Sequence, residues 1–141
     1  MKRPIRRLAW PLSIAAILGI VFWLIGQQRT SALPLESALD TGSLRLEIVT
    51  LTAHSSPMEE SHFLVRITDS NGLPVEADKL QIKTWMPKMF CGIFTAGIAP
   101  GGENGQYDAV VLPVMRGRWV AEANIQVGKE TYKLQHEYVV R

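Results

Sequence analysis

The residues with the clearest capacity for chemistry lie in one short segment, residues 85–92, with the sequence WMPKMFCG. Met86 and Met89 place two thioethers three residues apart, and Cys91 adds a thiol two residues further on. Soft sulfur ligands favour Cu(I) over harder ions, and Pro87 restricts the backbone between the methionines. The segment therefore predicts a soft-metal site, with Met115 as a further candidate ligand. The alternative interpretation is that this cluster of Met, Phe and Trp side chains packs at one end of a hydrophobic core.

The remaining polar residues predict no catalytic or metal site. His54 and His62 flank a loop that also holds Met58, but a separation of eight residues is not a recognised ligand spacing, so we expect surface histidines. His136 falls on the apolar face of an expected strand, which predicts a hydrogen-bonded core histidine. The chain has no G-x-S-x-G, H-E-x-x-H or P-loop motif. One cysteine excludes an intrachain disulfide and a four-thiolate zinc site. We therefore predict that the protein is not an enzyme.

An alternating pattern of apolar and polar residues dominates the chain after residue 42. It is interrupted by Gly, Pro, Asn and Asp clusters, which is typical of short antiparallel strands joined by turns. Two strands are expected to bury one face each, formed by Trp119, Ala121, Ala123, Ile125 and Val127 and by Tyr132, Leu134, His136, Tyr138 and Val140. The pattern predicts an all-β domain over residues 43–141, an immunoglobulin-like β-sandwich of about seven strands. A small barrel is the alternative architecture.

The net charge of +2 is unevenly distributed along the 141 residues. Four basic residues lie within residues 1–7, so the rest of the chain carries −2, and the basic character is no evidence for nucleic-acid binding. Residues 8–26 are 19 residues without a charge, long enough as a helix to approach the ~30 Å hydrocarbon core of a bilayer. The basic tail places the N-terminus in the cytoplasm. We expect a single-pass transmembrane anchor, a linker over residues 27–42 and a domain exported to the periplasm or cell exterior.

The alternative for the N-terminal segment is a cleaved signal peptide. Its apolar region usually runs ~7–15 residues and ends at a small-residue cleavage site. The apolar run here is longer, and the best available site is Thr30-Ser31-Ala32. Both interpretations place the domain outside the cytoplasmic membrane.

The order of several short motifs resembles the YtkA-like/FixH-like family of membrane-anchored exported domains. The resemblance covers about 60 residues between Asp69 and Val127. It rests on three elements in order: D-x-x-G-x-P-V at Asp69, Gly72, Pro74 and Val75; M-P-x-M at Met86, Pro87 and Met89; and G-x-Y followed by M-x-G-x-W at Gly105, Tyr107, Met115, Gly117 and Trp119.

This resemblance implies an immunoglobulin-like sandwich without catalysis, associated with copper handling or with the assembly of haem-copper oxidases. Phe90 stands where the family pattern has Gly after the second methionine, and no His follows, so Cys91 either substitutes as a soft ligand or the copper site is lost. Two functions follow as expectations. The first is an accessory or interaction module of a membrane complex, with an oxidase or copper transporter as partner. The second is a Cu(I)-binding or copper-delivery protein that uses Met86, Met89 and Cys91.

Overall fold

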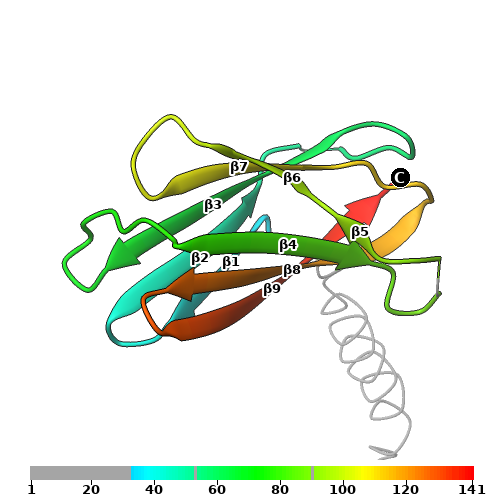
Figure 1. The fold of residues 1–141 in the computed structure, drawn as a ribbon. Helices are drawn as coiled ribbons and strands as arrows, with labels where there is room; N and C mark the ends of the chain where they lie inside the picture. Colours follow the sequence, from blue (N-terminus) through cyan, green and yellow to red (C-terminus); the bar gives the residue numbers. More distant parts are fainter. Residues whose placement is uncertain (1–32, 53, 90) are drawn as a thin grey trace, which may run out of the picture. The chain divides into compact units, whose positions relative to one another are not determined.

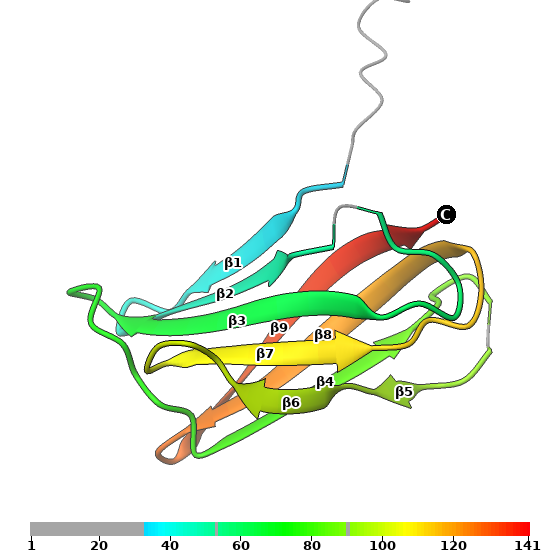
Figure 2. The same ribbon diagram turned by 90° about the horizontal axis from the view of Figure 1, so that it is seen from above.

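The computed structural model describes residues 33–52, 54–89 and 91–141, and the account below concerns these residues. They form two antiparallel β-sheets packed face to face (Figures 1 and 2). The strands are β1 (Glu36–Asp40), β2 (Leu44–Thr50), β3 (Ser61–Asp69), β4 (Lys79–Trp85), β5 (Phe94–Thr95), β6 (Gly97–Pro100), β7 (Gln106–Val111), β8 (Gly117–Val127) and β9 (Glu130–Val140).

The order of the strands within the sheets is that of an immunoglobulin domain. One sheet has the order β1-β2-β3-β7-β6 and the other β5-β4-β8-β9. In chain order, β2, β3, β7 and β6 correspond to the ABED sheet, and β4, β8 and β9 to the CFG sheet. The predicted all-β, immunoglobulin-like sandwich is therefore confirmed, with nine strands in the described residues instead of about seven. Two separate sheets replace the barrel alternative.

The core between the sheets is built by alternate residues of each strand. The predicted inward faces of β8 and β9 are confirmed. Trp119 and Ala121 of β8 and Leu134 of β9 are buried, and along β9 from Leu134 onward buried and exposed residues alternate. The largest fully buried side chains are Trp119 and Phe63. Phe63 packs edge-on against Tyr138, with ring centroids 5.0 Å apart, which is a favourable aromatic geometry.

The first strand, β1, corrects the predicted linker. Residues 36–40 pair with β2 from Glu36 opposite Val49 to Asp40 opposite Arg45, so the prediction that residues 27–42 form a linker is wrong from residue 36 onward. The sequence ESALD hides this strand because Glu, Ala and Asp have low strand propensity. The basic tail, the predicted anchor at residues 8–26 and the start of the linker lie outside the described residues. Within residues 33–141, the described part contains no helix long and apolar enough to cross a membrane.

The connections between strands gather at two opposite ends of the sandwich (Figure 2). The turn end is formed by residues 41–43, 70–78, 101–105 and 128–129. The loop end is formed by the described residues among 33–35, 51–60, 86–93 and 112–116, together with Arg141.

Backbone hydrogen bonds join the segments of the loop end to one another. The N–H of Met58 donates to the carbonyl of Pro113 at 2.7 Å, and the N–H of Arg141 donates to that of Ser55 at 2.8 Å. The Thr50 N–H donates to the carbonyl of Leu35 at 2.8 Å. The chain therefore enters β1 at the loop end.

Candidate functional site

Met86 continues the inward face of β4 and is buried in the core, with 9 % of its surface exposed. Its terminal methyl carbon lies close to Gly117, at the start of β8. A Cβ atom on Gly117 would come within 2.5 Å of that methyl, and the backbone there has a φ of +139°. Only glycine fits this position without rearrangement. Met86 is therefore packed mainly as a core residue, as the alternative interpretation of this segment expects.

Met89 lies in the turn that follows and is 52 % exposed. Its N–H donates to the Met86 carbonyl at 3.4 Å, and the Cys91 N–H donates to the Met89 carbonyl at 2.9 Å. Beside this turn is an open hollow of about 680 Å³. Its lining is formed by Lys83, Trp85, Met86, Pro87, Lys88, Met89, Ile93 and Glu122.

The structure brings two of the four predicted ligands to this hollow. Met86 and Met89 line it, whereas Cys91 and Met115 do not. Cys91 is half-buried and packs against the core. Met115 is 41 % exposed on the loop between β7 and β8, where its carbonyl accepts the indole N–H of Trp119 at 2.9 Å.

The only soft metal ligands among the described residues that line the hollow are two thioethers. Among the described residues, no group of three or more His, Cys, Asp or Glu side chains is placed to bind a metal ion. Among the described residues that line the hollow, the thioethers of Met86 and Met89 are the soft donors, and the lining includes no imidazole or thiol.

Sequence reasoning missed Lys83, Ile93 and Glu122, which lie outside the predicted segment 85–92 and also line the hollow. Trp85 and Lys83 lie on the outer face of β4, and Lys83 is opposite Glu122 on β8. Ile93 is 61 % exposed next to β5. The alternation along β4 could have indicated Lys83, because it puts Lys83 and Trp85 on the outer face of the strand and Thr84 on the inner face. Apolar side chains with lysines at the rim are suited to a protein surface that carries apolar and acidic groups.

His136 is the buried histidine that the sequence predicts. It is completely buried on β9, and its Nδ1 is 2.9 Å from the Ser37 hydroxyl of β1 and its Nε2 2.6 Å from the Thr50 hydroxyl of β2. The imidazole therefore links the two sheets. Burial lowers the pKa of His136 below its usual range, opposed by the negative charge of Glu137.

The two other histidines are exposed, as predicted. His54 and His62 both lie at the surface. The Nε2 of His62 is 3.5 Å from a carboxylate oxygen of Glu60.

Residues of the first family-like element stabilise the turn end. The carboxylate of Asp69 accepts the N–H groups of Asn71 at 2.8 Å and Leu73 at 2.9 Å. These bonds, that from Leu73 first, lower the pKa of Asp69. Gly72 follows with a φ of +80°, which favours glycine. These residues are therefore accounted for by the turn itself.

The G-x-Y element has an equally structural role. A Cβ on Gly105 would lie 2.8 Å from the carbonyl oxygen of Ile67, so the backbones approach too closely for a side chain. The Tyr107 hydroxyl accepts the N–H of Ala77 at 2.8 Å and holds the long connection from β3 to β4. No ligand is needed to explain either residue.

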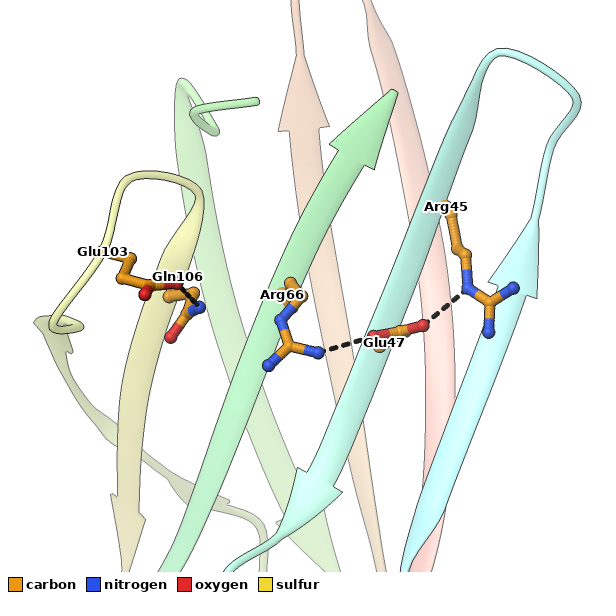
Figure 3. A network of polar contacts seen from close by, with 5 residues as sticks. All are labelled: Arg45, Glu47, Arg66, Glu103 and Gln106. Atoms are coloured by element: carbon orange, nitrogen blue, oxygen red, sulfur yellow. Dashed lines mark hydrogen bonds and ion pairs between the residues drawn. The ribbon is translucent and has the colours of Figure 1, made fainter. Parts of the chain in front are cut away.

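The outer face of the first sheet carries a small charge network (Figure 3). The carboxylate of Glu47, on β2, lies 2.5 Å from the Arg45 guanidinium and 3.3 Å from that of Arg66 on β3. A separate pair joins the Gln106 amide to Glu103 at 2.6 Å. Glu47 is largely covered while both arginines are about half exposed, so the network shields one carboxylate from solvent.

Exposed apolar side chains concentrate at the loop end. Of the nine large apolar side chains that are exposed in the described residues, Leu73 lies at the turn end. The other eight lie at or next to the loop end: Leu35, Leu51, Met58, Met89, Ile93, Leu112, Met115 and Val139.

Comparisons with known proteins identify a fold and no family. No protein-family model matches the chain, and no curated protein sequence matches it. A DUF4785 family protein from Legionella pneumophila is similar in structure, with a TM-score of 0.53 and 11 % identity over 72 % of this chain. The chain spans 29 % of the length of that protein. The Lin-41 filamin domain is aligned with a TM-score of 0.43 and 12 % identity, over 78 % of this chain and 95 % of that domain.

At 11 % identity, the likeness to the DUF4785 family protein shows the fold alone. Membership of the YtkA-like/FixH-like family stays a prediction.

Proposed function

We propose that this protein is a non-enzymatic, single-pass membrane-anchored domain outside the cytoplasmic membrane, acting as an accessory or interaction module of a membrane complex. The observation that carries the proposal is the hollow beside the β4–β5 turn. Trp85, Met89 and Ile93 give it an apolar lining, and Lys83, Lys88 and Glu122 also line it, so that its charged residues sum to +1. Aromatic and methionine side chains are enriched at protein interfaces, and a cationic rim selects an acidic partner surface.

The test is site-specific photocrosslinking of the full-length protein in membranes of the native host. A photoreactive side chain at Ile93, in the hollow, is compared with one at Leu73, at the turn end; both native side chains are 61 % exposed. We expect the Ile93 probe to yield an adduct with one membrane protein and the Leu73 probe to yield none.

Charge reversal tests whether that adduct depends on the hollow. Lys88→Glu should weaken the adduct, while Lys129→Glu, at the exposed turn end, should leave it intact. Equal crosslinking from Ile93 and Leu73, or an adduct that is indifferent to Lys88→Glu, would contradict a docking role for the hollow.

A second candidate function, Cu(I) binding, is supported by one observation: Met86 and Met89 line the same hollow. Thioethers are soft ligands that suit Cu(I). In this arrangement the exposed Met89 would be the entry ligand and the core residue Met86 the inner one.

Copper binding is tested by competition between the full-length protein in detergent and a Cu(I) chelator. Met89→Leu keeps the apolar volume of the side chain and removes the sulfur, and it should abolish any binding. The control is Met58→Leu, because Met58 is exposed at the loop end outside the lining of the hollow. Unchanged affinity in Met89→Leu would rule out the hollow as the copper site.

A further inference from the structure

The two ends of the sandwich differ sharply in chemistry. The turn end is rich in glycine and polar residues, and of the exposed large apolar side chains in the described residues it carries only Leu73. The loop end and its margin carry the other eight. Soluble domains rarely expose contiguous apolar surface, and where they do, it usually contacts a partner or a membrane.

The chain enters the domain at this same end. Leu35 is hydrogen-bonded to Thr50, and the described chain begins two residues earlier, at Leu33. Six residues, 27–32, separate Leu33 from the uncharged run that ends at residue 26. Six residues reach about 20 Å when fully extended. An anchor in the uncharged run would therefore keep the loop end close to the bilayer surface.

The charges at the loop end suit contact at the level of the lipid headgroups. Arg116 and Arg141, which lie outside the hollow, are exposed on two different segments, and neither forms an ion pair with another described residue. Such side chains extend toward phosphates while their alkyl stems cover apolar surface. The acidic pair Glu59 and Glu60 borders Met58, which limits the contact to shallow insertion.

We propose that the loop end rests on the outer surface of the lipid bilayer, with Leu112 and Met115 at the boundary between headgroups and acyl chains and the cations on lipid phosphates. This inference rests on the membrane anchor of the proposed function. It deepens that function by assigning the lipid surface itself as the partner of this end, and it leaves the neighbouring hollow for a protein.

The test uses the full-length protein in nanodiscs of phosphatidylethanolamine and phosphatidylglycerol that contain no other protein. An environment-sensitive fluorophore is attached at Leu112→Cys or Leu73→Cys, with Cys91→Ala in both so that only one thiol reacts. Leu73 is the matched control because it is the same residue type and more exposed, at 61 % against 45 %. A spin-labelled lipid with its quencher near the headgroup reports contact.

We expect a blue shift and strong quenching at position 112 and neither at position 73. Should Leu112→Cys fail to fold, Met115→Cys takes its place, since Met115 is exposed on the same loop. Equal quenching at the two ends overturns the lipid contact, while the anchored module stands. Flotation with lipid vesicles after an alkaline wash tests the anchor separately, and a chain that does not float refutes the anchor and this inference together.

Discussion

The buried imidazole of His136 makes stability depend on pH in a direction that the structure determines. His136 is fully buried, with both ring nitrogens within hydrogen-bonding distance of a hydroxyl, one from β1 and one from β2. Burial lowers its pKa in the folded protein below the ordinary value of 6.5. As the pH falls below 6.5, the unfolded chain takes up a proton that the folded protein resists. The contribution to stability is therefore complete above pH 6.5 and is lost as the pH falls toward the folded pKa.

The magnitude follows from the linkage of one proton. Between the two pKa values, the free energy of unfolding should fall by at most about 1.4 kcal/mol per pH unit. His136→Gln should remove this slope and, because a buried hydrogen-bonded side chain is replaced, lower stability at neutral pH by about 1–3 kcal/mol. Asp69 and Glu122 contribute little to this window, since their pKa values lie below their ordinary ones and they titrate in more acidic solution.

The assay is urea unfolding of the compact Leu33–Arg141 unit, which has its own core, from about pH 7.5 to about pH 5.5. His62→Gln is the control, since that histidine is exposed and its loss should leave the slope in place. A wild-type unfolding midpoint that does not move across this range would refute the reasoning. The same slope in His136→Gln would refute it as well.

Three further substitutions test the packing. Gly117→Ala should lower the free energy of unfolding in urea by about 1–3 kcal/mol, because alanine is strained at a φ of +139° and its Cβ displaces the Met86 methyl. Gly128→Ala, with a φ of +62° and open space, should lower it less in the same urea assay. Tyr138→Phe leaves the hydroxyl of buried Thr84, 2.9 Å away, without that partner and should lower the free energy of unfolding by about 1–2 kcal/mol. Glu47→Ala should cost less than about 1 kcal/mol in denaturant unfolding, because both arginine partners are half exposed; a larger loss would show that the network stabilises more than its exposure allows.

The alternation of apolar and polar residues predicted most of the fold. The faces of β8 and β9 follow from residues 117–140, because each strand there is long enough to repeat the pattern several times. Strand β1 was missed because five residues with two acidic side chains show too few repeats, and its pairing depends on β2, which folds beside it. In such short segments, pairing with a neighbouring strand outweighs a low intrinsic strand propensity.

The sequence predicted which segment forms the candidate site, but not the full set of residues that line it. The M-P-x-M spacing correctly indicated the turn beside the hollow, since Met86 and Met89 both line it. It did not indicate that Cys91 lies outside the lining, because the direction of a side chain in a turn depends on the backbone of that turn. Glu122 lies 36 residues after Met86 in the chain and reaches the hollow only through the pairing of β8 with β4.

The close approach of Met86 to Gly117 changes how the family-like motifs are counted. The methyl of Met86 occupies the space that a side chain at position 117 would need, and Trp119, two residues on, is fully buried in the core. The M-P-x-M and M-x-G-x-W elements are thus partly one packing unit, since a side chain at position 117 would collide with the Met86 methyl. Two motifs linked by one contact are weaker support for a family than two independent ones. Met89 is different, because its half-exposed side chain has no comparable packing role. Met89 is therefore the methionine of this segment that is accessible to a partner.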